Sequence, residues 1–450
     1  MKIPQQGTPR DEITKAMRAY RDADADAARA RLFSLVYATR PDVLEVAKEA
    51  YTSFFSENAL NPMAFPSLRR METEAVAMTL DLMNAPDGAA GSMTSGGSES
   101  LLLALKTARD WARVERPKIT RPRVLLPVTA HPALFKAAHM LDLEVDVVPM
   151  TAGFGADAAA ARRLVTDDTI LVVGSAPQYP HGVVDPIAEL AAIAEERGIL
   201  CHVDACFGGF MLPWVEKLGH PVPPFDFRVP GVTSISADLH KYGYAAKGAS
   251  SVLYRTRALR RHQFYVHADW PGGLFVSPGV LGTRPGGAIA AAWAVLKYLG
   301  PEGYLDLAKR AMSATRTIAS GVREIAGLDV LGEPVMSAIA IGTRASGAEP
   351  PLDIYVIGDL MQARGWFFDR GQSPPNLHLT VSPAHEAIAG EFLADLRACV
   401  AEARASKEQP QGKAALYGML GSLPDRAVVR DALLELMDSF DADGGAPAAS

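Results

Sequence analysis

Two patterns of apolar and polar positions divide the chain. Up to Gly88, apolar side chains recur every three to four positions among charged ones, which predicts amphipathic helices. Residues 11 to about 58 are predicted to be helical, and "DVLEVAKEAYTSFF" is the clearest stretch. The segment "PSLRRMETEAVAMTLDLMNAPDG" predicts a further helix, which ends at its Asn-Ala-Pro-Asp-Gly sequence.

Further along, short β-branched runs alternate with alanine-rich segments of helical period. Strands separated by helices predict right-handed crossovers and a largely parallel sheet with helices on both faces. The runs are continuously apolar, as expected for strands that are buried on both sides. The predicted strands cover 123–128, 143–150, 169–176, 199–205, 232–238 and 250–255, and the helices between the early ones cover 132–141, 156–165 and 185–198.

The last third of the chain has a different pattern. The Gly- and Pro-rich segment "WPGGLFVSPGVLGTRPGG" precedes a predicted long helix, "AIAAAWAVLKYLG". Helices and short strands then mix, with "DIYVIGDLMQARG" as a helix and "NLHLTVS" as a strand, which predicts a separate α+β module. We therefore expect an N-terminal helical segment (1–70), a large domain (71–302), a small C-terminal domain (303–440) and a disordered low-complexity tail (441–450).

Composition narrows the class of protein. A chain of 450 residues with 48% apolar and 21% charged residues is expected to bury a sizeable core. Its net charge of -6 argues against a nucleic-acid partner, so a local basic site must meet any anionic ligand. The three cysteines have no metal-ligand spacing, and no run approaches the roughly 18 apolar residues of a spanning helix. The first 30 residues also lack the apolar core of a secretory signal. We expect a cytoplasmic protein without a metal or a transmembrane anchor.

One glycine-rich stretch is suited to a phosphate. In "MTSGGSESLLLALK", Gly96 and Gly97 precede Ser98, Glu99 and Ser100, which open a predicted helix. Free backbone amides and the helix dipole favour an anion there, and glycine allows the backbone to approach it closely. Taken alone, the stretch is better explained as an ordinary serine N-cap with Glu or Ser in the first turn.

Two further polar positions follow predicted strands. Asp204 ends an apolar run, at the edge of the sheet where open α/β folds bind ligands, although it could also cap the next turn. Lys241 follows the strand that ends in "SISAD" and can form a Schiff base when deprotonated, although a His-Lys pair in a loop is often solvated. Together with the glycine-rich stretch, they supply the parts that pyridoxal phosphate requires.

The order of the motifs resembles the sphingosine-1-phosphate lyase family, within the group related to amino-acid decarboxylases. The motifs are "FPSLRRMETE", "SMTSGGSESLLLALK", "SAPQYPHGVVDPI", "HVDACFGGF", "FDFRVPGVTSISADLHKYGYAAKG" and "WPGGLFVSPGVLGTRPGG". The resemblance extends from about Tyr37 through "GKAALYGMLGSLPDR". It implies the α/β fold of aspartate aminotransferase (fold type I of pyridoxal-phosphate enzymes), pyridoxal 5'-phosphate as cofactor and a homodimer with shared active sites.

Matched motif by motif, the resemblance implies roles around the cofactor. Lys241 would carry the cofactor as a Schiff base, Asp204 would pair with the ring nitrogen, and His131 would stack on the ring. A "GTRPGG" loop would reach across the dimer to the neighbour's cofactor phosphate. The other residues implied to bind the cofactor are Gly97, Ser98, Ser175, His240 and, from that loop, Thr283.

The resemblance also assigns the substrate end. Lys247 matches a lysine that holds the substrate's own phosphate; alternatively it meets a helix C-terminus or solvent. Tyr37 and Asn58 resemble residues at the same end, whereas Asn61 stands where relatives often carry a histidine. Tyr179 and His181 are candidates for handling protons near the cofactor.

The implied reaction is retro-aldol cleavage of a phosphorylated sphingoid base into a fatty aldehyde and phosphoethanolamine. The sequence leaves the base for the C3 hydroxyl open: Lys241 once released, a tyrosine, His181 or the substrate phosphate. An amino-acid decarboxylase on the same fold is the nearest alternative, and Lys247 and the C-terminal "ALYGM" argue against it. A non-catalytic scaffold is a further alternative, which the presence of Lys241, Asp204 and His131 together makes less favourable.

Overall fold

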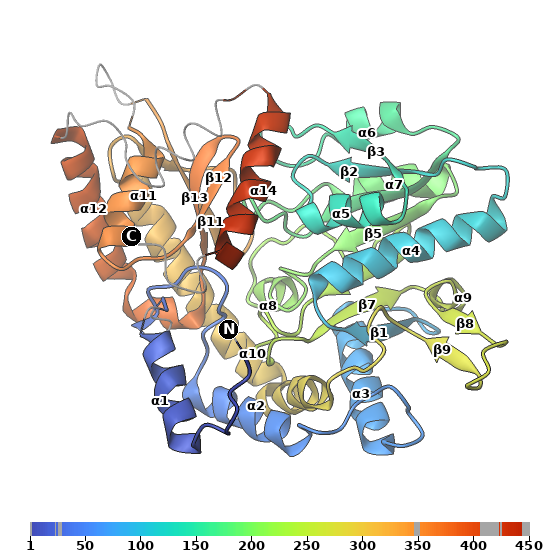
Figure 1. The fold of residues 1–450 in the computed structure, drawn as a ribbon. Coiled ribbons are helices and arrows are strands. Elements are labelled where there is room, and N and C mark those ends of the chain that lie inside the picture. Colours follow the sequence, from blue (N-terminus) through green and yellow to red (C-terminus); the bar gives the residue numbers. More distant parts are fainter. Residues whose placement is uncertain are drawn as a thin grey trace.

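The computed structural model describes residues 2–22, 24–25, 29–345, 352–405, 423 and 425–442. Figure 1 shows two regions side by side: one holds a large sheet and its helices, and the other holds a smaller sheet and its own helices. Helix α10 (Gly286–Arg323) runs between them and is kinked at Gly300, which precedes Pro301. Within the described residues, no helix has both the length and the apolar character to cross a membrane.

Seven strands form the central sheet, in the order β1-β7-β6-β5-β4-β2-β3. The strands from β2 to β6 run parallel, and β7 is antiparallel to both of its neighbours. The predicted α/β fold with a mainly parallel sheet is therefore confirmed. The strands are β1 (Ala90–Thr94), β2 (Arg123–Pro127), β3 (Glu144–Val148), β4 (Thr169–Ser175), β5 (Leu200–Asp204), β6 (Ser234–Ala237) and β7 (Ser250–Tyr254).

Both faces of this sheet are covered by helices. In β4, Leu171 and Val173 pack into the core with α4 and α5, whereas Val172 packs into the core with α6, α7 and α8. Successive side chains of a strand point to opposite faces, so this alternation explains why the run had to be apolar throughout. The helices around the sheet are α3 (Pro66–Leu82), α4 (Gly97–Glu115), α5 (Pro132–Met140), α6 (Ala158–Leu164), α7 (Ile187–Glu196), α8 (Leu212–Lys217) and α9 (Arg257–Arg261).

The C-terminal region has an antiparallel sheet and a core of its own. Four strands pair in the order β10-β11-β13-β12, and their apolar residues pack with α11 and α12. A separate hairpin, β8–β9, precedes α10. The remaining elements are β8 (Tyr265–His267), β9 (Phe275–Ser277), β10 (Leu328–Val330), β11 (Ala338–Thr343), α11 (Ile354–Ala363), β12 (Asp369–Gln372), β13 (Pro375–Thr380), the 3-10 helix η2 (Pro383–Ala387), α12 (Ala389–Ala405) and α14 (Arg426–Ala442).

The prediction of one helical region over residues 11–58 is wrong in its middle. Helices α1 (Arg10–Arg21) and α2 (Pro41–Ser53) are separated by an extended strap, residues 31–40. The strap pairs with the C-terminal region, since Phe33 N–H donates to Phe367 O (2.8 Å) and Thr380 N–H donates to Phe33 O (2.7 Å). Phe33 is fully buried in the C-terminal core, and this tertiary contact overrides the local helical pattern.

Two predicted features lie outside the described residues. The "ALYGM" segment falls within 406–422, and the predicted disordered tail falls within 443–450 except for its first two residues. Helix α14 extends to Ala442.

Candidate active site

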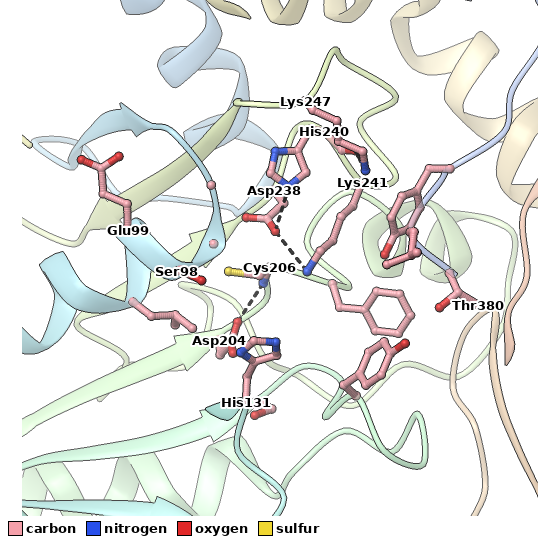
Figure 2. A pocket seen from close by; sticks show the side chains of 18 of the residues that line it. Ser98, Glu99, His131, Asp204, Cys206, Asp238, His240, Lys241, Lys247 and Thr380 are labelled. Atoms are coloured by element: carbon pink, nitrogen blue, oxygen red, sulfur yellow. Dashed lines mark hydrogen bonds and ion pairs between the residues drawn. The ribbon is translucent and has the colours of Figure 1, made fainter. Parts of the chain in front are cut away.

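A cavity of about 600 Å³ lies at the carboxyl ends of β4, β5 and β6, where open α/β sheets bind their ligands. The central sheet, the N-terminus of α4, the strap and the C-terminal sheet all contribute to its walls. Figure 2 shows Lys241 between Asp238 and Thr380, with Ser98 and Glu99 of α4 on the side opposite Thr380. Ten residues selected from the sequence meet here: Tyr37, Gly97, Ser98, His131, Ser175, Tyr179, Asp204, His240, Lys241 and Lys247.

Lys241 is paired with a carboxylate that the sequence reasoning missed. Its Nζ lies 3.0 Å from Oδ2 of Asp238, whose side chain is 1% exposed. Burial disfavours the charge on Lys241, but Asp238 outweighs this and holds the pKa of the amine above its ordinary value. His240 lies on the other side of the same oxygen, with Nε2 at 3.6 Å. The spacing of three residues between Asp238 and Lys241 was the available signal, because both follow directly from the end of β6.

Asp204 is held by a hydrogen-bond chain that runs into the sheet. Its Oδ1 accepts hydrogen bonds from Cys206 N–H (3.1 Å) and from the Ser236 hydroxyl (3.4 Å). The fully buried His202 ring lies between Ser234 (2.9 Å from Nδ1) and Ser236 (3.3 Å from Nε2). Burial lowers the pKa of His202 to about 4, so the ring is neutral and carries one N–H. Because Ser236 donates its proton to Asp204, that N–H belongs on Nε2 and Nδ1 accepts from Ser234.

The N-terminus of α4 is shaped by a buried glutamate that the sequence reasoning also missed. The two carboxylate oxygens of Glu99 accept hydrogen bonds from Ser95 N–H and Val280 N–H, each at 2.7 Å. This fixes the loop before the helix and a second loop that follows the β8–β9 hairpin. The amides of Gly97 and Ser98 remain available for an anion at the end of a 19-residue helix.

Gly97 is required by packing against the lysine's partner. A Cβ atom at this position would meet Oδ2 of Asp238 at 3.0 Å and Sγ of Cys206 at 3.1 Å. Any larger residue would push the helix N-terminus away from the Lys241–Asp238 pair. The close approach keeps the anion site and the amine in one cavity.

Two further predicted residues complete this side. His131 is the N-cap of α5, where its Nδ1 accepts a hydrogen bond from Ala133 N–H (3.2 Å), so the ring proton belongs on Nε2. Ser175 ends β4, and its buried hydroxyl has no hydrogen-bond partner among the described residues. A buried hydroxyl without a partner is costly, which indicates that a ligand satisfies it.

These donors fit pyridoxal phosphate. The amides of α4 suit its phosphate, Asp204 suits a protonated ring nitrogen, and Lys241 suits its aldehyde carbon. The unpartnered Ser175 hydroxyl and the side-chain-free surface at Gly97 are the structural observations that favour such an occupant. The cavity volume is within the range of sites for small cofactors.

The second lysine lies at the other end of the cavity. Lys247 Nζ contacts the carbonyl oxygen of His240 at 3.4 Å and lies 5.1 Å from the centroid of the Tyr37 ring. Among the described residues, no carboxylate lies within ion-pair distance of this amine. Partial burial and then the neighbouring Lys241 lower the pKa of Lys247. A cation without a carboxylate partner, placed beside an aromatic ring, is suited to an anionic group of a ligand.

The C-terminal sheet contributes Asp369 and Thr380, which were not selected from the sequence. The Tyr179 hydroxyl donates to Oδ2 of Asp369 at 2.5 Å. The Tyr179 ring lies 3.9 Å from the His378 ring and 5.6 Å from the Phe207 ring, between centroids. Burial and then Asp369 raise the pKa of Tyr179 well above its ordinary value.

Four predicted residues do not line this cavity. His181 is buried elsewhere, stacked on Phe154 with ring centroids 4.3 Å apart. Asn58 and Asn61 each accept a hydrogen bond from a backbone N–H two residues further on. Thr283 is exposed on the loop before α10, two residues before Pro285, which forms a β-bridge with Asn58.

Comparisons with known proteins agree with this geometry. The conserved domain of pyridoxal-dependent decarboxylases matches residues 25–343. A sphingosine-1-phosphate lyase from Arabidopsis thaliana is 43% identical over 397 residues, which cover 87% of this chain and 72% of that protein. The sphingosine-1-phosphate lyase 1 of Rattus norvegicus is 40% identical over 442 residues, 97% of this chain and 76% of that one. The solved structure of a Burkholderia pseudomallei sphingosine-1-phosphate lyase is similar with a TM-score of 0.86 and 39% identity, covering 98% of this chain and 97% of that chain.

Proposed function

This chain belongs to the sphingosine-1-phosphate lyase family, and from that premise we propose that it is a pyridoxal-phosphate-dependent carbon–carbon lyase. Its substrates are phosphorylated sphingoid bases, which it cleaves between C2 and C3 into a fatty aldehyde and phosphoethanolamine. The main support for this proposal is that one cavity is lined by Lys241, Asp204 and the N-terminus of α4. Lys247 lies at the far end of the same cavity.

The cofactor, when bound, accepts the electron pair that is released at C2 as the C2–C3 bond breaks. Gly97, Ser98 and His240 bind its phosphate, with Ser175 as a further hydrogen-bond donor. Asp204 keeps the ring nitrogen protonated, and His131 covers one face of the ring. The hydrogen bonds that run from Asp204 through Ser236 to His202 orient the carboxylate toward the ring nitrogen. They also offset part of the free-energy cost of burying it.

Lys241 is the residue that binds the cofactor aldehyde. An amine must lose its proton before it can attack a carbonyl carbon, and Asp238 lies 3.0 Å away to receive that proton. The ion pair also positions the Lys241 amine in the cavity, where the cofactor aldehyde would be held. Asp238 is therefore proposed as the group that controls the charge of Lys241.

Lys247 and Tyr37 bind the phosphate of the substrate. The absence of a carboxylate partner for Lys247 among the described residues supports this role, since a phosphate would supply the missing charge. Tyr37 adds a hydroxyl donor from the strap. A substrate without this phosphate would leave the lysine without an anionic partner.

Asn58, Asn61 and Thr283 are proposed to act in the neighbouring subunit of a homodimer. The β-bridge between Asn58 and Pro285 joins the two segments that carry them, and none of the three lines the cavity of its own chain. The adjoining β8–β9 hairpin exposes Trp270 (53%) and Leu274 (89%), as a surface that packs against another chain would. This arrangement would give each active site residues from both subunits. A cytoplasmic location remains a prediction.

An L-amino-acid decarboxylase is the alternative function on this fold. The test is incubation of the purified chain, loaded with pyridoxal phosphate, with phosphorylated sphinganine and separately with amino acids. Release of phosphoethanolamine and hexadecanal is the expected result. Carbon dioxide from an amino acid, without cleavage of the phosphorylated base, would instead establish the decarboxylase.

A further inference from the structure

The proposed cleavage needs a group that takes the proton of the C3 hydroxyl. This inference rests on that proposed function and identifies the acceptor from the four carboxylates that line the cavity: Glu99, Asp204, Asp238 and Asp369. A general base must be free to accept the proton and must lie within hydrogen-bond reach of it, directly or through one bridging group.

Three of the four carboxylates are already committed. Glu99 accepts two backbone N–H groups at 2.7 Å, one on each oxygen. Asp204 accepts hydrogen bonds from Cys206 and Ser236 at the end of the cavity that receives the cofactor ring. Asp238 is ion-paired with Lys241 at 3.0 Å. Protonation of Glu99 or Asp204 would break hydrogen bonds that hold the site together, and Asp238 is committed to the proton of Lys241.

Asp369 differs from the others. Among the described residues, its only side-chain partner is the Tyr179 hydroxyl, which donates to Oδ2 at 2.5 Å. It reaches the cavity from β12 of the C-terminal sheet, whereas Tyr179 comes from the loop after β4 of the central sheet. The hydrogen bond therefore joins the two sheets across the cavity.

The Tyr179 phenol is positioned to bridge a substrate hydroxyl in the cavity and the Asp369 carboxylate. Its ring is fixed against His378 and Phe207, with centroid distances of 3.9 and 5.6 Å, so the hydroxyl has a defined position. Because the phenol gives its proton to Asp369, its oxygen is an acceptor; the Thr380 hydroxyl uses one of its two lone pairs, and the other can accept from a substrate hydroxyl in the cavity. The raised pKa of Tyr179 excludes a standing phenolate near neutral pH, so the phenol can accept a proton only as it passes its own proton on.

We propose that Tyr179 and Asp369 form a proton relay, in which Asp369 is the final acceptor of the substrate's C3 hydroxyl proton. The hydroxyl proton moves to Oη of Tyr179 while the phenol proton moves to Oδ2 of Asp369. The freed electron pair on the substrate oxygen forms the aldehyde C=O bond. The C2–C3 bond breaks, and its electron pair stays on C2 of the amine-bearing fragment. Tyr179 ends neutral, Asp369 ends protonated, and one negative charge has moved from the carboxylate to the fragment.

The test uses the full-length enzyme loaded with pyridoxal phosphate and the variant Asp369→Asn, which keeps the size of the side chain. We expect kcat with phosphorylated sphinganine to fall by about 10²-fold or more, as for loss of a general base, while KM changes by less than about threefold. Binding of the 3-deoxy analogue, which has no hydroxyl proton to lose, should stay within about threefold of wild type by calorimetry. The control is Asp167→Asn, an exposed carboxylate outside the cavity, which should retain full activity.

A second variant tests the relay as a unit. Tyr179→Phe should lose kcat to a similar extent, and the double variant Tyr179→Phe/Asp369→Asn should be no slower than the slower single variant, because both changes interrupt one path. Fully multiplicative losses in the double variant would overturn the relay. So would Asp369→Asn with kcat within about threefold of wild type, or with an equal loss of affinity for the 3-deoxy analogue, which would indicate a structural role. Failure of the wild-type enzyme to cleave phosphorylated sphinganine would instead refute the proposed function itself.

Discussion

The two ends of the cavity differ in how their charges are paired. At the cofactor end, Asp238 is matched to Lys241 within 3.0 Å, and Asp204 is held by hydrogen bonds from its own sheet. At the substrate end, Lys247 has no carboxylate partner among the described residues, and Asp369 has only a phenol. Because the charges at the cofactor end are paired within the protein, this end keeps its geometry without a ligand. The charges at the substrate end lack such partners, so they depend on the ligand for compensation.

The largest effect is expected at the paired cofactor end. Lys241→Ala removes the amine that binds the cofactor, and kcat should fall by at least about 10⁴-fold, as for the loss of a catalytic nucleophile. Product release measures the activity, and borohydride treatment followed by mass spectrometry measures covalent cofactor attachment. Attachment at another lysine with retained turnover would contradict the assignment.

Asp238→Asn breaks the pairing but keeps the shape. It leaves the half-buried Lys241 ammonium without its carboxylate, so the free energy of unfolding should fall by about 3 kcal/mol and the pKa of Lys241 should fall with it. Burial alone would raise the pKa of Asp238, but Lys241 and then His240 outweigh it and lower that pKa in the folded state. The contribution of Asp238 is therefore fully present above the unfolded pKa of about 3.9 and is lost as the pH falls through the lower folded value.

Chemical denaturation at several pH values measures this difference. The gap in stability between wild type and Asp238→Asn should be widest near neutral pH and narrow as the medium becomes strongly acidic. Lys241, whose pKa is raised, loses its contribution at the other extreme, as the pH rises above the unfolded value of about 10.4 and through the folded one. A gap independent of pH would show that the pair does not carry the effect.

At the substrate end, Lys247→Ala should have an effect that depends on the ligand. The value of kcat/KM for phosphorylated sphinganine should fall by roughly 10- to 100-fold, the loss of one charged contact, while cleavage of the unphosphorylated base changes little. The surface variant Lys309→Ala provides a control of equal charge change. An equal loss of kcat/KM with the phosphorylated and the unphosphorylated base would show that Lys247 does not bind the substrate phosphate.

The smallest effect is expected for the hydrogen bond that the Ser236 hydroxyl donates to Asp204. Ser236→Ala removes the hydrogen bond to this carboxylate, so the Kd of pyridoxal phosphate should rise about fivefold, the worth of one hydrogen bond. Ser234→Ala removes the other partner of His202 without touching Asp204 and should leave this Kd unchanged. Fluorescence titration with the cofactor compares the two variants. Equal Kd values for Ser236→Ala and Ser234→Ala would show that the hydrogen bonds through Ser236 and His202 do not position Asp204.

The sequence predicted much of the cofactor end because its residues directly follow buried strands. Asp204 and Lys241 could be located from the apolar runs before them, and Gly97 from the helix that it opens. Asp238 was missed although it stands three residues before the lysine, since a carboxylate at a strand end has many ordinary roles. Residues 31–40 were predicted as helix because their pattern is compatible with one until Phe33 is buried in a distant core.

What the sequence determined by itself is local and periodic: a mainly parallel sheet covered on both faces, the motifs at its carboxyl edge, and the family to which their order belongs. What only the tertiary structure decided is which distant segments meet there. Asp369 and Tyr179 are 190 residues apart, and Tyr37 reaches the cavity because the strap pairs with the C-terminal sheet. Such contacts depend on packing between two cores, and no periodicity along a single segment can encode them.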